Sequence, residues 1–257
     1  MRGKGLGAAL LFVALGLSVA SPSWAATSPD SIGLFNPTSA QWHLRTATGA
    51  ILSIFYGVPG DLPLTGDWDC NGIDTPGVFR STTGQFLLRN SPTTGEADIE
   101  FFFGMAGDIP LVGDWDDDGC DSVGVYRQGQ VLIRNSLDTG FADHSFFFGM
   151  PGDQPYGGDF NGDGISTVGL HRESNGRIYI RRSLTSGISD LEFFYGNRDD
   201  QVVVGDWDGD GDDTVGLYRP SAGRFYLSTE HGLAVADIEV PFGGGLFVPV
   251  AGFFVEA

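Results

Sequence analysis

The sequence predicts an all-β protein, a five-bladed β-propeller of four-stranded blades closed by pairing of its N- and C-terminal segments in one blade. Three observations lead to this prediction. A long segment recurs along the chain, each copy holds four short stretches of β character, and the chain begins and ends part-way through a copy. Four strands per repeat of this length is typical of a propeller blade.

The first 25 residues are expected to form a secretory signal peptide rather than part of the fold. Arg2 and Lys4 precede an apolar run over residues 6–20, and residues 23–25 (SWA) fit a small-x-small cleavage site. The run is too short to span a membrane, and no later stretch is long and apolar enough, so we expect no membrane insertion. The protein is therefore expected to be extracellular or periplasmic after cleavage near Ala25.

The repeat is most visible in an acidic loop that occurs four times. It reads GDWDCNGIDTPGVFR at 66–80, GDWDDDGCDSVGVYR at 113–127, GDFNGDGISTVGLHR at 158–172 and GDWDGDGDDTVGLYR at 205–219, at steps of 47, 45 and 47 residues. In each copy one β segment precedes the loop and a second follows it directly. A third and a fourth come next, separated by Gly, Asn, Asp or Pro, as expected of turns between strands.

The two ends of the chain share the fifth repeat. DSIGLF at 30–35 matches DSVGVY at 121–126, and LFVPVAGFFVEA at 246–257 matches the segment that leads into the second acidic loop. A blade completed by both ends leaves no free sheet edge, so we expect a single domain over 26–257. Its blades are expected at about 30–58 plus 247–257, 59–104, 105–149, 150–196 and 197–243.

The acidic loops carry the oxygen pattern of a calcium site. Asp or Asn stands at the first, third and fifth positions, a glycine follows at the sixth, and calcium takes six to eight such oxygens. Three loops also have an acid at the eighth position, where the third loop has Ser166, and whether this residue reaches the ion stays open. The alternative is a solvated Asx-rich turn without metal. The candidate ligands are Asp67, Asp69, Asn71, Asp74, Asp114, Asp116, Asp118, Asp121, Asp159, Asn161, Asp163, Asp206, Asp208, Asp210 and Asp213.

These repeats resemble the FG-GAP and VCBS-type repeats of integrin α-chain propellers and of many secreted bacterial proteins. The likeness lies in DWDxxG, DFNGDG and the preceding FFG, and it covers four repeats with the loop and one without it. It implies a propeller with calcium in its loops. The family usually has an acid at the ninth loop position, where this chain has Thr or Ser. Because the family ranges from adhesion receptors to lectins and domains attached to enzymes, it does not specify a ligand.

The acidic composition limits the partners. The chain has 14 basic and 33 acidic residues, a net charge of −19, which becomes −21 without Arg2 and Lys4. Such a surface repels nucleic acid. No nucleophile elbow, zinc motif or phosphate loop occurs in the sequence. We therefore expect a monomeric binding or adhesion module for an extracellular glycan or protein, lectin-like if equivalent pockets occur on several blades. The alternative is a carbohydrate-active hydrolase or lyase in the central channel, which two unrepeated carboxylates at its mouth would favour.

Other repeated residues are expected to be structural. The aromatic second position of each loop is expected in the core between blades; its members are Trp68, Trp115, Phe160 and Trp207. One Arg–Asp ion pair per blade is expected on the opposite face, the alternative being a ring of polar pockets; the pairs join Arg80, Arg127, Arg172 and Arg219 to Asp61, Asp108, Asp153 and Asp200. Cys70 and Cys120 lie in neighbouring loops and are expected to form a disulfide in an oxidising compartment.

Overall fold

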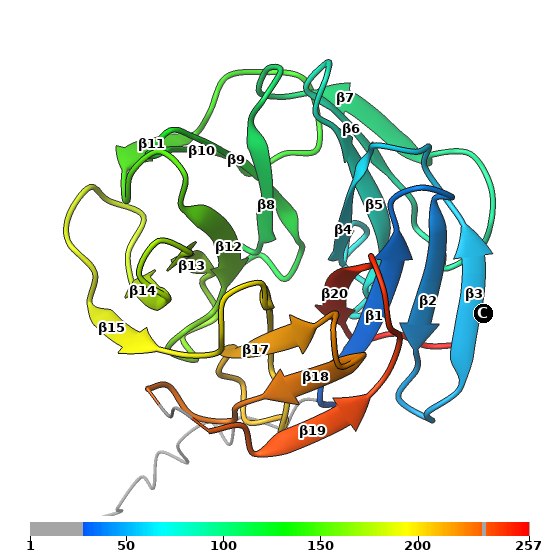
Figure 1. Cartoon of the computed structure of the whole chain (residues 1–257). Coiled ribbons are helices and arrows are strands. Elements are labelled where there is room, and N and C mark those ends of the chain that lie inside the picture. The colour runs from blue at the N-terminus through cyan, green and yellow to red at the C-terminus, as the bar shows by residue number, and fades with distance from the viewer. Residues whose placement is uncertain (1–27, 233–234, 257) are drawn as a thin grey trace, which may run out of the picture.

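Five four-stranded antiparallel sheets stand around a central opening (Figure 1), as a computed structural model of the chain shows. The structure describes residues 28–232 and 235–256, so the expected signal peptide lies outside the described residues. This part of the chain forms twenty β-strands and contains no helix, hence none that could cross a membrane. The predicted five-bladed propeller is confirmed.

One blade is built from both ends of the chain, and we call it the closing blade. From the channel outward it contains β20 (Val248–Gly252), β1 (Ser31–Asn36), β2 (Gln41–Arg45) and β3 (Ile51–Phe55). β1 and β20 pair antiparallel, from Ser31 opposite Gly252 to Phe35 opposite Val248. The predicted pairing of the two ends is confirmed, and it replaces a free edge at the channel with a hydrogen-bonded ladder.

Each of the other four blades consists of consecutive strands, of which the first borders the channel and the fourth lies at the rim (Figure 1). The blades are β4 (Leu62–Gly66), β5 (Thr75–Arg80), β6 (Gln85–Leu88) and β7 (Ile99–Phe102); β8 (Ile109–Gly113), β9 (Ser122–Arg127), β10 (Gln130–Arg134) and β11 (His144–Phe147); β12 (Gln154–Gly158), β13 (Thr167–Arg172), β14 (Arg177–Arg181) and β15 (Leu191–Phe194); and β16 (Gln201–Gly205), β17 (Thr214–Arg219), β18 (Arg224–Leu227) and β19 (Ile238–Pro241).

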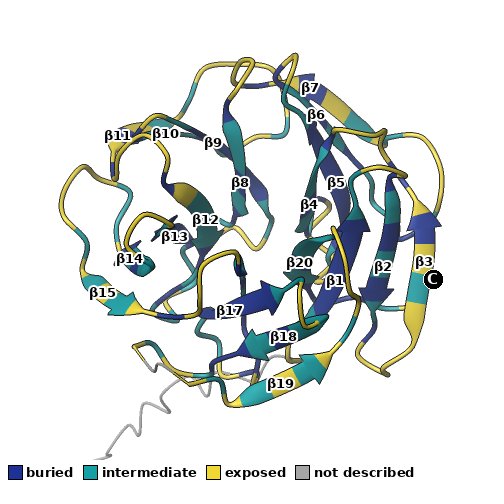
Figure 2. Ribbon diagram, in the orientation of Figure 1, coloured by how far each residue is buried: buried dark blue, intermediate teal, exposed yellow. Residues whose placement is uncertain are grey.

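The place of a strand within its blade decides its burial (Figure 2). The second strands of the four loop-bearing blades, such as β9 and β17, have five buried residues followed by an arginine, because neighbouring blades cover both of their faces. In the closing blade, β1 has four buried residues and ends in Asn36. The third strands alternate between buried and half-buried residues. The fourth strands end in an exposed Phe in four of the five blades. Nearly continuous apolar sequence therefore marks the second strand, as in other sheets covered on both sides.

The hydrophobic core lies between blades rather than within them. Each of its five clusters joins side chains of two neighbouring blades; Trp115, for example, shares a cluster with Val168 and Leu170 of the next blade. The predicted core role of the aromatic second loop position is confirmed, because Trp68, Trp115, Phe160 and Trp207 are all at most 5% exposed. Phe254 takes the same repeat position in the closing blade and is fully buried. The aromatic side chains therefore link the blades into one ring.

Candidate functional site

Four acidic loops join the first strand to the second in all blades except the closing one. We number them loop 1 (67–74), loop 2 (114–121), loop 3 (159–166) and loop 4 (206–213). In loop 2 the carboxylate of Asp114 accepts the N–H of Asp118 at 3.2 Å and that of Gly119 at 2.8 Å. The first aspartates of the other three loops accept the equivalent two N–H groups. The first aspartate therefore folds each loop around its own carboxylate.

The remaining loop geometry follows from the glycines and from short side chains. The sixth-position glycine of every loop has a positive φ, for example 82° at Gly119, which a residue with a Cβ adopts only with strain. The fifth-position oxygen accepts the N–H of the seventh residue, as Asp118 does from Cys120 at 2.9 Å. These bonds fix the turn of each loop.

Loops 2 and 4 bring three carboxylates together. One oxygen each from Asp114, Asp116 and Asp118 lies within 4.8 Å of the others, and the first, third and fifth aspartates of loop 4 form an equivalent group. Burial, followed by repulsion from Asp210, raises the pKa of Asp208. Three carboxylate oxygens at this separation fit the coordination sphere of a hard divalent cation such as calcium.

Loops 1 and 3 carry one asparagine each in place of a carboxylate. In loop 1, Asn71 at the fifth position accepts the N–H of Ile73 at 2.8 Å, as the aspartates do elsewhere. In loop 3, the amide of Asn161 donates to the carboxylate of Asp163 at 2.7 Å. Burial raises the pKa of Asp159 in the same loop. These two loops therefore present the same donor positions with one negative charge fewer.

The eighth residue of each loop lies at the boundary with the neighbouring blade. In loop 2, the carboxylate of Asp121 accepts the N–H of Asp67, the first residue of loop 1, at 2.9 Å. In loop 3, Ser166 plays the same part toward Asp114, with its hydroxyl oxygen as acceptor at 3.1 Å. We call the five residues in this position the junction residues: Asp30, Asp74, Asp121, Ser166 and Asp213. The candidate ligands Asp74, Asp121 and Asp213 are thus engaged with the adjacent blade rather than with the three oxygens of their own loop.

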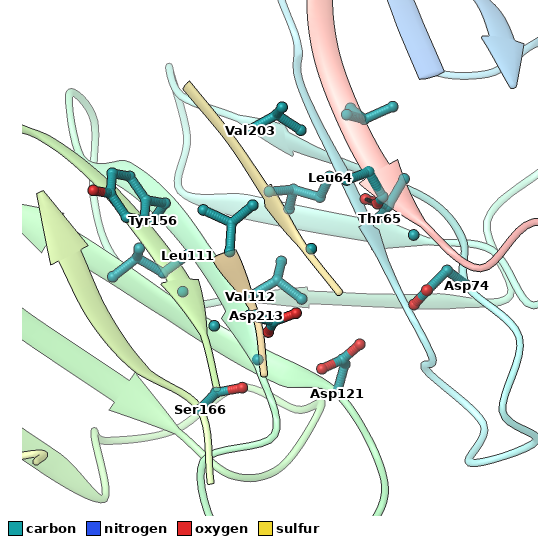
Figure 3. Close-up of a pocket in the computed structure, with 18 of the residues that line it drawn as sticks. Leu64, Thr65, Asp74, Leu111, Val112, Asp121, Tyr156, Ser166, Val203 and Asp213 are labelled. Atoms are coloured by element: carbon teal, nitrogen blue, oxygen red, sulfur yellow. Dashed lines mark hydrogen bonds between the residues drawn. The ribbon is translucent and has the colours of Figure 1, made fainter. Parts of the chain in front are cut away.

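The junction residues line one end of the central channel, a cavity of about 290 Å³ (Figure 3). Solvent reaches them partly along the channel, but protein surrounds the carboxyl groups. Burial, with repulsion from Asp213, raises the pKa of Asp30 from 3.8 to about 8. Burial likewise raises the pKa of Asp74 and of Asp213 to about 7 and that of Asp121 well above its usual value. These carboxylates occupy one repeated position, so they are not the unrepeated pair that would favour an enzyme in the channel.

The predicted Arg–Asp pairs are present on the face opposite the loops. Arg172 donates to both carboxylate oxygens of Asp153 at 2.7 Å, and Asp153 is 1% exposed and also accepts the N–H of Met150. The other three pairs, from Arg80, Arg127 and Arg219, have the same form. Each pair fastens the end of a second strand to the turn before the first strand. The predicted ion pairs are confirmed.

The structure also contains the predicted disulfide. Cys70 of loop 1 and Cys120 of loop 2 are bonded, with their Cα atoms 4.6 Å apart. The bond joins two neighbouring acidic loops on one face of the ring. Neither cysteine occupies a first, third or fifth loop position, so the bond uses none of the candidate ligand positions.

A groove between two blades has no counterpart in the predictions from sequence. It has a volume of about 420 Å³ and lies between the blades that begin with β8 and β12. Arg172, Tyr179 and Glu192 line it, and the Arg172 guanidinium lies 4.5 Å from the centre of the Tyr179 ring. The next blade repeats this set as Arg219, Tyr226 and Glu239. The signal in the sequence was the shared tyrosine of RIYI and RFYL, where the other two loop-bearing blades have leucine.

Arginines of the third strands are a further set that sequence reasoning missed. Arg134 donates to the carbonyl oxygen of Phe141 at 2.7 Å, and Arg181 donates likewise to Ile188. They hold the turn between the third and fourth strands in place. Arginine recurs at this position in four blades, as Arg45, Arg89, Arg134 and Arg181, and that recurrence was the available signal.

No family model matches the chain, and no curated protein matches it. Among solved structures, a virginiamycin B lyase from Staphylococcus aureus is similar at 14% identity and a TM-score of 0.43, over 79% of this chain and 63% of the lyase. A lectin from Agrocybe aegerita that recognises non-reducing terminal N-acetylglucosamine is similar at 12% identity and a TM-score of 0.45, over 86% of this chain and 78% of the lectin. Both likenesses are too distant to bear on ligand or activity.

Proposed function

We propose that the protein is a secreted, monomeric, calcium-binding propeller that serves as a binding module for an extracellular ligand. The observation that carries the proposal is the convergence of alternate loop oxygens, with three carboxylates within 4.8 Å of one another in loops 2 and 4. The same donor positions recur in loops 1 and 3. A disulfide between neighbouring loops supports an oxidising, extracellular setting.

Calcium would be held by the first, third and fifth residues of each loop. Bound there, the ion supplies positive charge to a cluster of carboxylates that otherwise repel one another. The loop connects the two innermost strands of a blade, so an occupied loop stabilises the folded ring. The proposed ligands are Asp67, Asp69 and Asn71; Asp114, Asp116 and Asp118; Asp159, Asn161 and Asp163; and Asp206, Asp208 and Asp210.

A glycan is the extracellular ligand that the groove beside Tyr179 favours. The groove combines an aromatic ring with the charged side chains of Arg172 and Glu192, which offer hydrogen-bond donors and acceptors to sugar hydroxyls. The next blade repeats the same side chains as Arg219, Tyr226 and Glu239, which supports a binding position that recurs around the ring. The hydrolase or lyase alternative would use the channel, whose carboxylates are hydrogen-bonded into the contacts between blades.

Thermal unfolding with and without a chelator tests whether calcium binds the loops. If free calcium exceeds the dissociation constant about tenfold, each occupied site stabilises the fold by roughly 1.4 kcal/mol. Four sites then contribute about 6 kcal/mol, or about 10–20 °C in the midpoint of a domain of this size. We expect Asp206→Ala to remove about a quarter of the chelator effect. Asp212→Ala, which removes a charge from the same loop but no proposed side-chain ligand, is the matched control. If the thermal midpoint is the same with and without chelator, the loops are solvated turns without calcium.

A glycan array tests the ligand. We expect the mature protein to bind a restricted set of glycans, and Tyr179→Ala to weaken that binding by removing the aromatic wall of the groove. The exposed Phe141, on the turn at the rim of the neighbouring blade, provides the control substitution Phe141→Ala. Glycan turnover by the protein, in place of binding, would favour the enzyme.

A further inference from the structure

An equivalent pair of hydrogen bonds occurs at each of the five boundaries between neighbouring blades. The junction residue donates its backbone N–H to the carbonyl of the first loop residue of the adjacent blade, and its side chain accepts the N–H of that same residue. For Asp213 and Asp159 the two distances are 2.7 and 2.8 Å. For Asp30 and Asp206 they are 2.7 and 3.1 Å. At four of the five junctions, the residue held in this way is the first proposed calcium ligand of the loop.

The same contact is one reason for the glycine before each of these first residues, beside crowding from the aromatic second loop residue or a neighbouring valine. A Cβ on Gly205 would lie 2.8 Å from the carboxylate oxygen of Asp30, and a Cβ on Gly66 would lie 3.0 Å from that of Asp121. Real Cβ atoms rarely approach an oxygen so closely. The glycine of the repeated GDW or GDF motif therefore makes room both for the aromatic residue of its own loop and for the side chain of the neighbouring blade.

The first loop residue is fixed from two sides. Its carboxylate organises its own loop, as Asp206 does by accepting the N–H groups of Asp210 and Gly211 at 3.1 and 3.0 Å. Its main-chain N–H and C=O are held by the junction residue of the adjacent blade. The position of the first ligand oxygen thus depends on a side chain that belongs to a different repeat.

We infer that each junction residue acts across the blade boundary, as a positioning residue for the metal loop of the neighbouring blade rather than as a ligand of its own loop. The inference rests on the proposed calcium function and adds a residue from outside each loop to its metal site. Asp30 is the clearest case, because it follows no acidic loop and is separated from Asp206 by 176 residues. Ser166 shows that a neutral hydroxyl serves in the same place.

The closing blade supplies an internal control. Asp74 stands at the eighth position of loop 1, but its carboxylate accepts the N–H of Phe253, at 2.6 Å, in a repeat that has no acidic loop. Removing Asp74 therefore removes the same kind of contact without touching the first ligand of any loop. If the eighth residue were instead a ligand of its own loop, Asp74 would be required by loop 1.

Calcium titration by calorimetry of the mature wild-type protein and three variants tests the inference. Wild-type protein should bind at four sites. Asp30→Ala should weaken one site about tenfold, as expected from loss of a hydrogen bond that orders a charged ligand, and leave three unchanged. Asp30→Ser, which keeps an acceptor but no charge, should restore that site. Asp74→Ala should leave all four constants unchanged. Circular dichroism establishes that every variant is folded.

Amide hydrogen exchange, measured in the presence of chelator, tests the same inference without bound metal. The N–H of Asp206 should lose protection in Asp30→Ala and keep it in Asp30→Ser. Four unaltered constants in Asp30→Ala, or the loss of one site in Asp74→Ala, would overturn the inference while leaving the calcium proposal in place. Absence of calcium binding by the wild-type protein would overturn both.

Discussion

Phe254 packs the C-terminal segment into the core of the closing blade, and replacing it measures how much that packing contributes to stability. Phe254 is fully buried in the closing blade, in a cluster with Phe35 and Trp42 and with Val78 of the neighbouring blade. Truncating a buried Phe to Ala typically costs about 3–5 kcal/mol, from lost burial and the cavity that remains. In a domain of this size Phe254→Ala should lower the thermal midpoint by about 6–20 °C.

The assay is thermal and denaturant unfolding followed by circular dichroism, at one fixed calcium concentration so that linkage is equal in all samples. Phe141→Ala is the matched control, because Phe141 is 94% exposed. Its effect should stay within about 0.5 kcal/mol. If Phe254→Ala costs no more than the control, the C-terminal segment does not complete the core of the closing blade.

Three further predictions concern the stability of the fold. Deleting residues 245–257 removes β20 and its ladder with β1, so the truncated chain should aggregate or unfold without cooperativity, and a soluble truncation with an unchanged midpoint would refute closure. Arg172→Met leaves Asp153 buried without its partner and should cost about 3–5 kcal/mol in denaturant unfolding; a loss below about 1 kcal/mol would show that the pair is dispensable. In chelator, the midpoint should fall from pH 5 to pH 8. Burial raises the pKa of Asp30 to about 8 and that of Asp213 to about 7, so the native state binds protons more tightly than the unfolded chain. The native state therefore loses stability as the pH rises through this range. A thermal midpoint that rises with pH would contradict this assignment.

Repetition is what made most of the fold predictable from the sequence. The number of blades, the shared closing blade and the buried aromatics all follow from residues that return at the same repeat position. The Arg172–Asp153 pair was predictable for the same reason, because a separation of 19 residues recurs in each loop-bearing blade. A regular spacing fixes which residues share an environment even when the sequence does not state what that environment is.

The contacts between blades were not predictable in this way. Asp121 stands next to its own loop in the sequence, yet its carboxylate bonds the N–H of Asp67, 54 residues earlier. Which residue Asp121 contacts depends on the rotation from one blade to the next and on the direction in which the end of the strand faces. The repeat pattern encodes neither of these. The groove at Tyr179 was missed for a related reason, because a single tyrosine on a third strand does not show that the adjacent blade leaves space beside it.

The closing blade differs from the others in what holds it. It has no acidic loop, and its core aromatic Phe254 and its junction contacts are supplied by the last residues of the chain and by Asp30 near the start of the described part. The loop 1–loop 2 boundary, by contrast, has both a junction residue and the Cys70–Cys120 disulfide. Metal binding in the four loops would therefore stabilise blades that are each continuous in sequence, whereas the discontinuous blade depends on packing and on Asp30. Because Asp30 reaches loop 4, the blade without a metal loop of its own remains connected to the candidate metal sites of the ring.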